Sequence, residues 1–313
     1  MLKTLIPIFF SVAAAAQPIT KAKQYYENGQ LEQAHKILLT IDDDAADYHV
    51  AQYYLGRVAF DSNELDDAAD YFEEAIDHRN DISDYHLWYG NALGTIAQDA
   101  NIVRQGFLAP KIKAAFEQAV ALDSRNRDAL WGLVQYYTQA PGFMGGSYQK
   151  ALDMAGLLYQ VDKVQGYLAR ATVYQAEEKF DLVEKQYQQA AGIDPVYYFR
   201  LGYFYQQHGR YDEAFDTFDQ LSTYDEHQLN ALYQIGRTSA FSGKQAEKGV
   251  KALQQYLQAD VADNAPSHAA AKMRLGMIYE KTGQKTQAIR YYEEAVAADA
   301  SLTDASEGLK RLR

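Results

Sequence analysis

The chain has 313 residues, 48% hydrophobic and 23% charged, which is typical of an ordered soluble protein. Its formal net charge of −12 argues against nucleic acid and anionic lipid as general partners, because both are bound largely through neutralised phosphates. The absence of cysteine excludes disulfides, thiolate metal sites and a cysteine nucleophile. Tyrosine is frequent, with 26 residues against 13 phenylalanines, and suits both packing and wet recognition surfaces.

The first sixteen residues have the pattern of an export signal. Lys3 supplies a positive start, residues 5–16 are mostly apolar, and the alanines at 14–16 provide an A-x-A cleavage site. We therefore predict a signal peptide over residues 1–16, cleaved after Ala16, and a periplasmic mature protein. The apolar run is short for a membrane span. Retention as an N-terminal anchor, or use as a first core helix, are the alternatives.

From residue 17 onward, small and aromatic residues recur with a fixed period. Gly56 and Gly90 are 34 positions apart, and so are Gly202 and Gly236. Within 52–60 and 65–77, apolar residues recur at spacings of three and four, which indicates a pair of amphipathic helices. A period of this length predicts stacked helical hairpins. In the first such pair, we expect Gly56 to face Ala68.

The pattern resembles the tetratricopeptide repeat (TPR), which has a small residue in its first helix, an aromatic one turn later, and an A-x-x-x-F-x-x-A run in its second helix. The matching residues are Ala68, Phe72 and Ala75 in the second unit, Gly202, Tyr205, Ala214 and Phe218 in the sixth, and Gly276, Tyr279, Ala288, Tyr292 and Ala295 in the eighth. The resemblance implies an all-α fold, a right-handed superhelical solenoid of about eight hairpins in a single domain over 17–313. The expected units are 17–45, 48–80, 83–125, 126–162, 164–194, 195–227, 229–263 and 268–300, followed by a capping helix at 304–312.

Three insertions interrupt the period, near 98–110, 139–147 and 260–266. We expect the first two to lie on loops and close together in space, because solenoid insertions fall on loops, often at one rim. The run from Pro141 to Gly146 lacks the P-loop pattern, and Ser147 is predicted to cap the next helix. Phe143 and Met144 are loop contact candidates that either pack beneath the loop or form an exposed apolar contact.

No motif supports catalysis or metal binding. The seven histidines form neither an HExxH motif nor a close H-x-H pair, and no nucleophile is paired with a base. We expect no enzyme activity, no cofactor and no metal.

The first helices of a TPR array line its concave groove, so the predicted partner site is the inward positions counted from each small residue. These positions are Tyr53, Arg57, Phe60, Asn91, Val134, Tyr137, Phe199, Tyr203, Gln206, Tyr233, Arg237, Phe241, Met273 and Met277. Aromatic, methionine and arginine side chains are favoured at protein interfaces. Some of these positions could instead be core residues if the count is wrong by one. Too few of them carry lysine, arginine or asparagine for the family's carboxylate clamp.

The sequence therefore predicts a non-catalytic scaffold that binds a protein or peptide segment in its concave groove, in the bacterial cell envelope. Arg57 and Arg237 would pair with acidic or carbonyl groups. Two alternatives stay open: a small-molecule or metal-binding protein that uses the inserted segments, and a self-assembling structural component. The sequence does not define the oligomeric state.

Overall fold

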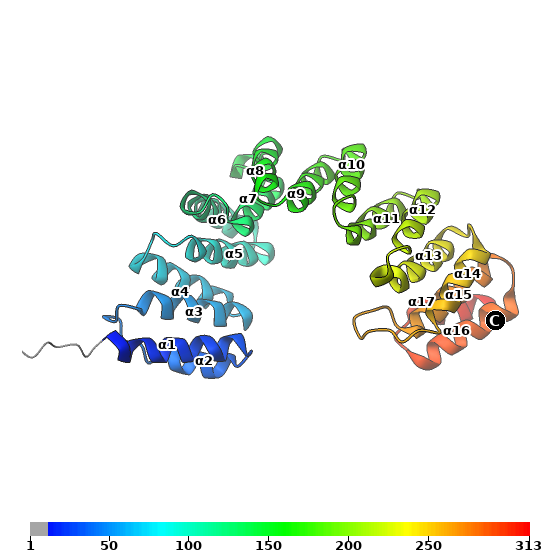
Figure 1. Ribbon diagram of the computed structural model, residues 1–313, viewed down its shortest axis with the longest axis horizontal. Coiled ribbons are helices and arrows are strands. Elements are labelled where there is room, and N and C mark those ends of the chain that lie inside the picture. The colour runs from blue at the N-terminus through cyan, green and yellow to red at the C-terminus, as the bar shows by residue number, and fades with distance from the viewer. Residues whose placement is uncertain (1–11) are drawn as a thin grey trace, which may run out of the picture. The chain divides into compact units, whose positions relative to one another are not determined.

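A computed structural model describes residues 12–313. This part of the chain is built from α-helices and three short 3₁₀ helices, with no strand (Figure 1). The predicted signal peptide lies outside the described residues as far as residue 11, and residues 12–16 begin the first helix. None of the described helices combines the length and the apolar composition needed to cross a bilayer.

The chain divides into two compact units, one ending at Glu177 and the other beginning at Glu178. The helices of the first unit are α1 (Val12–Glu27), α2 (Leu31–Leu38), α3 (Tyr48–Asp61), α4 (Leu65–His78), α5 (Ser83–Asp99), α6 (Ile102–Leu122), α7 (Arg127–Gln139), η1 (Gly142–Met144), α8 (Tyr148–Val161) and α9 (Lys163–Ala176). Four hairpins, α1/α2 to α7/α8, follow the predicted units, and α9 packs on the last of them.

The helices of the second unit are α10 (Phe180–Ala191), η2 (Pro195–Tyr197), α11 (Tyr198–Gln207), α12 (Tyr211–Leu221), η3 (Asp225–His227), α13 (Gln228–Ser242), α14 (Ala246–Tyr256), α15 (His268–Lys281), α16 (Lys285–Ala298) and α17 (Thr303–Leu312). Three hairpins again match the prediction. The fifth predicted unit, 164–194, is divided: α9 belongs to the first compact unit and α10 to the second.

In five hairpins a bulky side chain of the second helix lies over a glycine of the first helix, and in four of these five the side chain is an aromatic ring. A Cβ added to Gly56 would stand 2.6 Å from the Phe72 ring, and one added to Gly202 would stand 2.3 Å from the Phe218 ring. The periodic small residue therefore leaves room for a ring, and the fully buried ring fills the core. The Phe72 ring occupies the space over Gly56, and Ala68, which was expected to face Gly56, is fully buried one turn before Phe72 on the same helix.

The insertion at 98–110 is helical, so the prediction of a loop there was wrong. Asn101 accepts hydrogen bonds from the backbone N–H groups of Val103 and Arg104, and α6 begins at once. The inserted residues lengthen α6 at its N-terminus to 21 residues, with Pro110 inside the helix. Proline removes a helical hydrogen bond and so favours a break, but α6 continues through it.

The insertion at 139–147 is a compact loop against the start of α6. Tyr136 donates a hydrogen bond to the Met144 carbonyl oxygen at 2.5 Å, and Ser147 caps α8 as predicted. Met144 packs against the core, whereas Phe143 is 81% exposed. A Cβ added to Gly106 of α6 would stand 3.8 Å from the Met144 methyl group, so the two insertions are adjacent as expected.

The capping helix is also present, as α17. Gly308 lies against the Tyr292 ring, while Ala305 and Leu309 are buried. The insertion at 260–266 links α14 to α15 without a regular element, and its Pro266 carbonyl oxygen accepts a hydrogen bond from Tyr256 at 2.6 Å.

Candidate functional site

In the first unit, an arginine lies in a cluster of aromatic rings. The Arg57 Cζ atom of α3 is 3.7 Å from the centroid of the Trp88 ring. Its guanidinium donates hydrogen bonds to the hydroxyl oxygens of Tyr26 at 2.8 Å and Tyr53 at 3.1 Å. Within the described residues no carboxylate forms an ion pair with Arg57, and its Nε atom is buried without a hydrogen-bond partner.

The hydroxyl groups around Arg57 stay protonated near neutral pH. Burial and a 2.6 Å hydrogen bond to Asp61 raise the pKa of Tyr26 to about 12, and burial raises the pKa of Tyr53. Arg57 therefore contacts neutral oxygens and ring faces. Such contacts place the cation but leave its charge uncompensated by an anion in direct contact.

The second unit repeats this arrangement around Arg237 of α13. Arg237 donates to the Gln206 Oε1 atom at 2.7 Å, and its Cζ atom lies 5.3 Å from the Tyr203 ring centroid and 4.9 Å from that of Phe241. Arg274 of α15 approaches the same Phe241 ring, at 4.8 Å. The phenylalanine ring is thus shared by two guanidinium groups.

The two arginines of this cluster differ in charge compensation. Arg274 lies 3.7 Å from an Asp304 oxygen, while no carboxylate in the part of the chain described here pairs with Arg237. Burial lowers the pKa of the Arg237 guanidinium, and the Arg274 charge lowers it further, against an opposing effect of Tyr203. Arg237 remains charged at neutral pH, in a setting that an additional anion would stabilise.

The predicted groove residues fall into an exposed group and a buried group. Tyr203, which accepts a hydrogen bond from Gln234, is 37% exposed. The partly exposed residues are Tyr53, Arg57, Phe60, Asn91, Phe199, Arg237, Phe241 and Met277. Val134, Tyr137, Gln206, Tyr233 and Met273 are buried. Buried side chains offer little surface to a partner, so these five residues belong to the core behind the exposed groove residues.

Counting from the glycine missed Tyr26, Trp88 and Arg274. Arg274 directly follows the buried Met273, and it lies two residues before Gly276, just as Gln234 lies two residues before Gly236. That shared offset is the signal that would have identified the position. Trp88 likewise lies two residues before Gly90.

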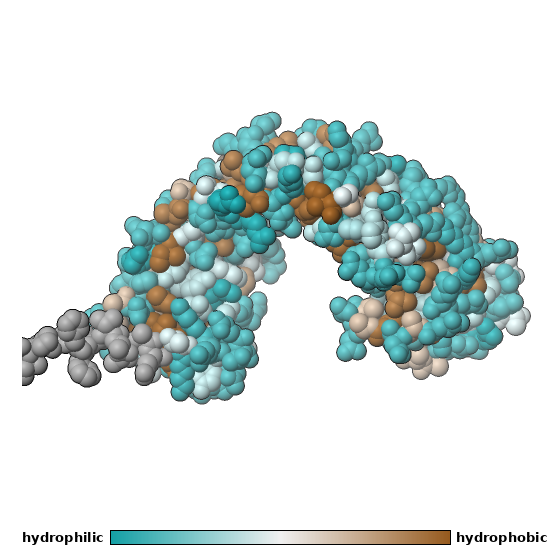
Figure 2. All heavy atoms as spheres, viewed as in Figure 1, coloured by the Kyte–Doolittle hydropathy of each residue, from teal (hydrophilic) through white to brown (hydrophobic). Residues whose placement is uncertain are grey.

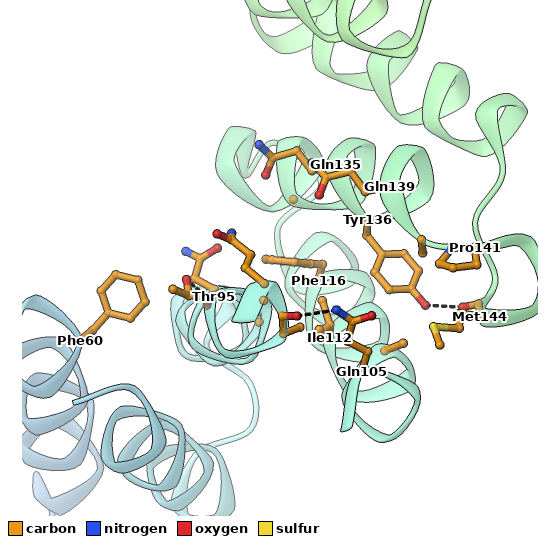
Figure 3. Close-up of a pocket in the computed structure, with 18 residues that line it drawn as sticks. Phe60, Thr95, Gln105, Ile112, Phe116, Gln135, Tyr136, Gln139, Pro141 and Met144 are labelled. Carbon is orange, nitrogen blue, oxygen red and sulfur yellow. Dashed lines mark hydrogen bonds between the residues drawn. The ribbon is translucent and has the colours of Figure 1, made fainter. Parts of the chain in front are cut away.

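A pocket of about 640 Å³ lies in the first unit, between α5, α6, α7 and the 139–147 loop (Figure 3). The lengthened start of α6 contributes Gln105, and the loop contributes Pro141 and Met144, so both insertions help to form it. Figure 3 shows Phe60 at one end and Tyr136, bonded to Met144, at the other. Within the described residues no three histidine or acidic side chains are grouped to hold a metal ion.

Exposed apolar side chains lie along the lengthened start of α6. Phe107 is 75% exposed on α6, as are Ile102 at 59% and Val103 at 65%. Elsewhere the visible face of each unit is mainly hydrophilic, with apolar residues in small groups (Figure 2).

Ring-over-glycine hairpins repeated along both units define a helical-repeat protein. Family profiles for the tetratricopeptide repeat match residues 19–93, 238–302 and 196–228, and the chain is a tetratricopeptide repeat protein. No curated protein matches it.

Two solved structures that are similar to the chain are described as TPR proteins. A TPR protein from Parabacteroides merdae has 12% sequence identity and a TM-score of 0.53, over 96% of this chain and 99% of that one. A thermophilic TPR protein from Thermus thermophilus has 14% identity and a TM-score of 0.48, over 61% of this chain and 98% of that one. The first likeness supports the all-α repeat fold. TPR proteins are generally non-catalytic, and the fold is in general that of a protein–protein interaction scaffold.

Proposed function

We propose that the protein is a non-catalytic scaffold of the bacterial cell envelope that binds a polypeptide segment of a partner along the predicted concave groove. The contact surface comprises the first helices of its hairpins, around Arg57 in one unit and Arg237 in the other. The export-signal pattern of residues 1–16 supports the location.

The observation that carries the proposal is that neither of these two arginines forms an ion pair with a carboxylate among the described residues. Most other arginines are paired with carboxylates, such as Arg210 with Glu184 and Arg311 with Glu280. Arg57 and Arg237 are held by rings and neutral oxygens in a chain with 42 acidic residues. In the described part of so acidic a chain, Arg57 and Arg237 lack a carboxylate partner, and each offers a place for an acid from a partner.

The surrounding rings define what accompanies that acid. Tyr203, Phe241 and Met277 are partly exposed, and rings give contact area at a low entropic cost. The preferred segment therefore carries an aspartate or glutamate flanked by apolar or aromatic residues.

Selection from a random peptide library displayed on phage tests this preference. We expect the selected peptides to be enriched in acidic residues next to apolar ones, and Arg237→Gln to lose them. The matched control is Arg290→Gln: Arg290 is also stacked on a ring, that of Tyr291 at 4.5 Å, but it lies on a second helix. Selection without acidic enrichment, or an identical selection by Arg237→Gln, would refute the proposal.

A further inference from the structure

The pocket of the first unit is lined without charge. No aspartate, glutamate, lysine, arginine or histidine lines it, although charged residues make up 23% of the chain. A charged ligand that entered the pocket would lose its hydration without gaining an opposite charge, and this desolvation costs free energy. The pocket therefore favours a neutral ligand.

Its polar groups come from two facing helices. Asn91 and Gln98 line it from α5, and Gln135 and Gln139 from α7, and Figure 3 shows the last two side by side on one wall. Within the described residues, none of these four side-chain amides forms a hydrogen bond to the protein, whereas Gln105 donates to the Ala97 carbonyl oxygen at 3.0 Å. Each amide both donates and accepts, so the arrangement suits a ligand with hydroxyl groups around its rim.

Packing within the protein does not explain why one position of the pocket lining is a glycine. A Cβ added to Gly90 or Gly132 would meet the Phe116 ring at 2.8 or 2.6 Å, which explains both. A Cβ added to Gly94, in the interior of α5, would meet nothing within 4 Å. Glycine in a helix interior costs about 0.5–1 kcal/mol relative to alanine. At Gly94 that cost keeps the pocket wall open for close approach to the helix backbone.

We propose that this pocket binds a neutral mono- or disaccharide. A sugar ring has hydroxyl groups on its perimeter for the facing amides and an apolar C–H face for the Phe60 ring. The volume lies in the range of about 300–1,000 Å³ that small-molecule sites occupy. The pocket shares Phe60 and Asn91 with the predicted groove, but neither Arg57 nor Arg237 lines it.

Saturation-transfer NMR and calorimetry on the full chain test the assignment, with glucose, N-acetylglucosamine and maltose as neutral probes and glucuronate as the charged counterpart of glucose. We expect a neutral sugar to bind with a Kd of about 1 mM or tighter, a free energy near −4 kcal/mol, and glucuronate to bind more weakly than glucose. Gly94→Leu should weaken binding at least about tenfold, a change of 1.4 kcal/mol, because its side chain fills the pocket.

The matched control is Gly156→Leu, since Gly156 in α8 is equally free of neighbours but lies outside the pocket. It should bind like the wild type. Gln135→Ala, at an exposed position of α7, gives a second variant with reduced binding should Gly94→Leu fail to fold. The proposal is overturned if no neutral sugar binds at about 10 mM, if the pocket variants bind normally, or if glucuronate or a blocked neutral dipeptide binds more tightly than every sugar.

Discussion

Replacing Gly56 with alanine tests the ring-over-glycine packing that forms the hairpins. The new Cβ would stand 2.6 Å from Cε1 and 2.7 Å from Cδ1 of Phe72. Real Cβ atoms essentially never come so close, and the Phe72 ring is fully buried, so it has no free space to move into. The substitution therefore forces a shift in the core between α3 and α4.

Two opposing effects determine how much Gly56→Ala changes the free energy of unfolding. Alanine in a helix interior gains about 0.5–1 kcal/mol over glycine, while overpacking of a core costs about 1–3 kcal/mol. We expect Gly56→Ala to lower the free energy of unfolding by about 1–2 kcal/mol. At Gly156, where a Cβ meets nothing within 4 Å, only the gain applies, so Gly156→Ala should raise it by up to about 1 kcal/mol.

Urea unfolding followed by circular dichroism measures both variants in the same compact unit. Because the cooperativity of a repeat array can break down, amide hydrogen exchange in α3 and α8 should accompany it. Combining Gly56→Ala with Phe72→Leu should recover part of the loss, since the smaller side chain relieves the contact. A neutral Gly56→Ala, or the same sign of effect at both glycines, would refute the packing argument.

Four further variants probe other parts of the fold. Tyr233→Ala should cost about 3–5 kcal/mol in urea unfolding because its ring is 6% exposed, while Tyr203→Ala should cost about 1 kcal/mol; equal losses would contradict the assigned burial. A hydrogen bond from Arg311 lowers the pKa of Glu280, so this pair stabilises the capping helix fully above the unfolded pKa near 4.3 and is lost as pH falls through the lower folded value. Glu280→Gln should remove that acid dependence from thermal unfolding curves, and an unchanged pH profile would count against it. Gly146→Ala would place a Cβ 1.7 Å from the Ala140 carbonyl oxygen, so we expect faster proteolysis of the 139–147 loop, and wild-type resistance would be inconsistent with the loop structure.

The repeat architecture could be predicted from the sequence because each hairpin carries its own signal. Gly202 and Phe218 are recognisable without knowledge of the rest, and their contact is local to one hairpin. The same holds for the cap at 303–312 and for Ser147, whose side chain bonds a backbone N–H three residues away. The secondary structure of the 98–110 insertion could not be predicted, because Asn101 caps a helix there and that helix contains Pro110.

The site was harder to predict because exposure depends on neighbouring hairpins. Tyr233 and Tyr203 both belong to first helices, but Tyr233 is buried in a cluster that includes Leu275 of the next hairpin, while Tyr203 reaches the surface. Arg274 was missed because its role arises from Phe241, which belongs to the preceding hairpin. A count within one helix does not contain that contact.

The most direct test of the proposed recognition surface is the affinity of one selected acidic peptide for three proteins, measured by fluorescence anisotropy at low and physiological salt. We predict that Arg237→Gln binds about tenfold to a hundredfold more weakly than the wild type, because hydrogen bonds to charged groups contribute about 1.5–3 kcal/mol, while Arg290→Gln binds normally. Equal affinities for all three proteins would contradict the proposal that the cation among the rings of α11 and α13 is what a partner's acid recognises.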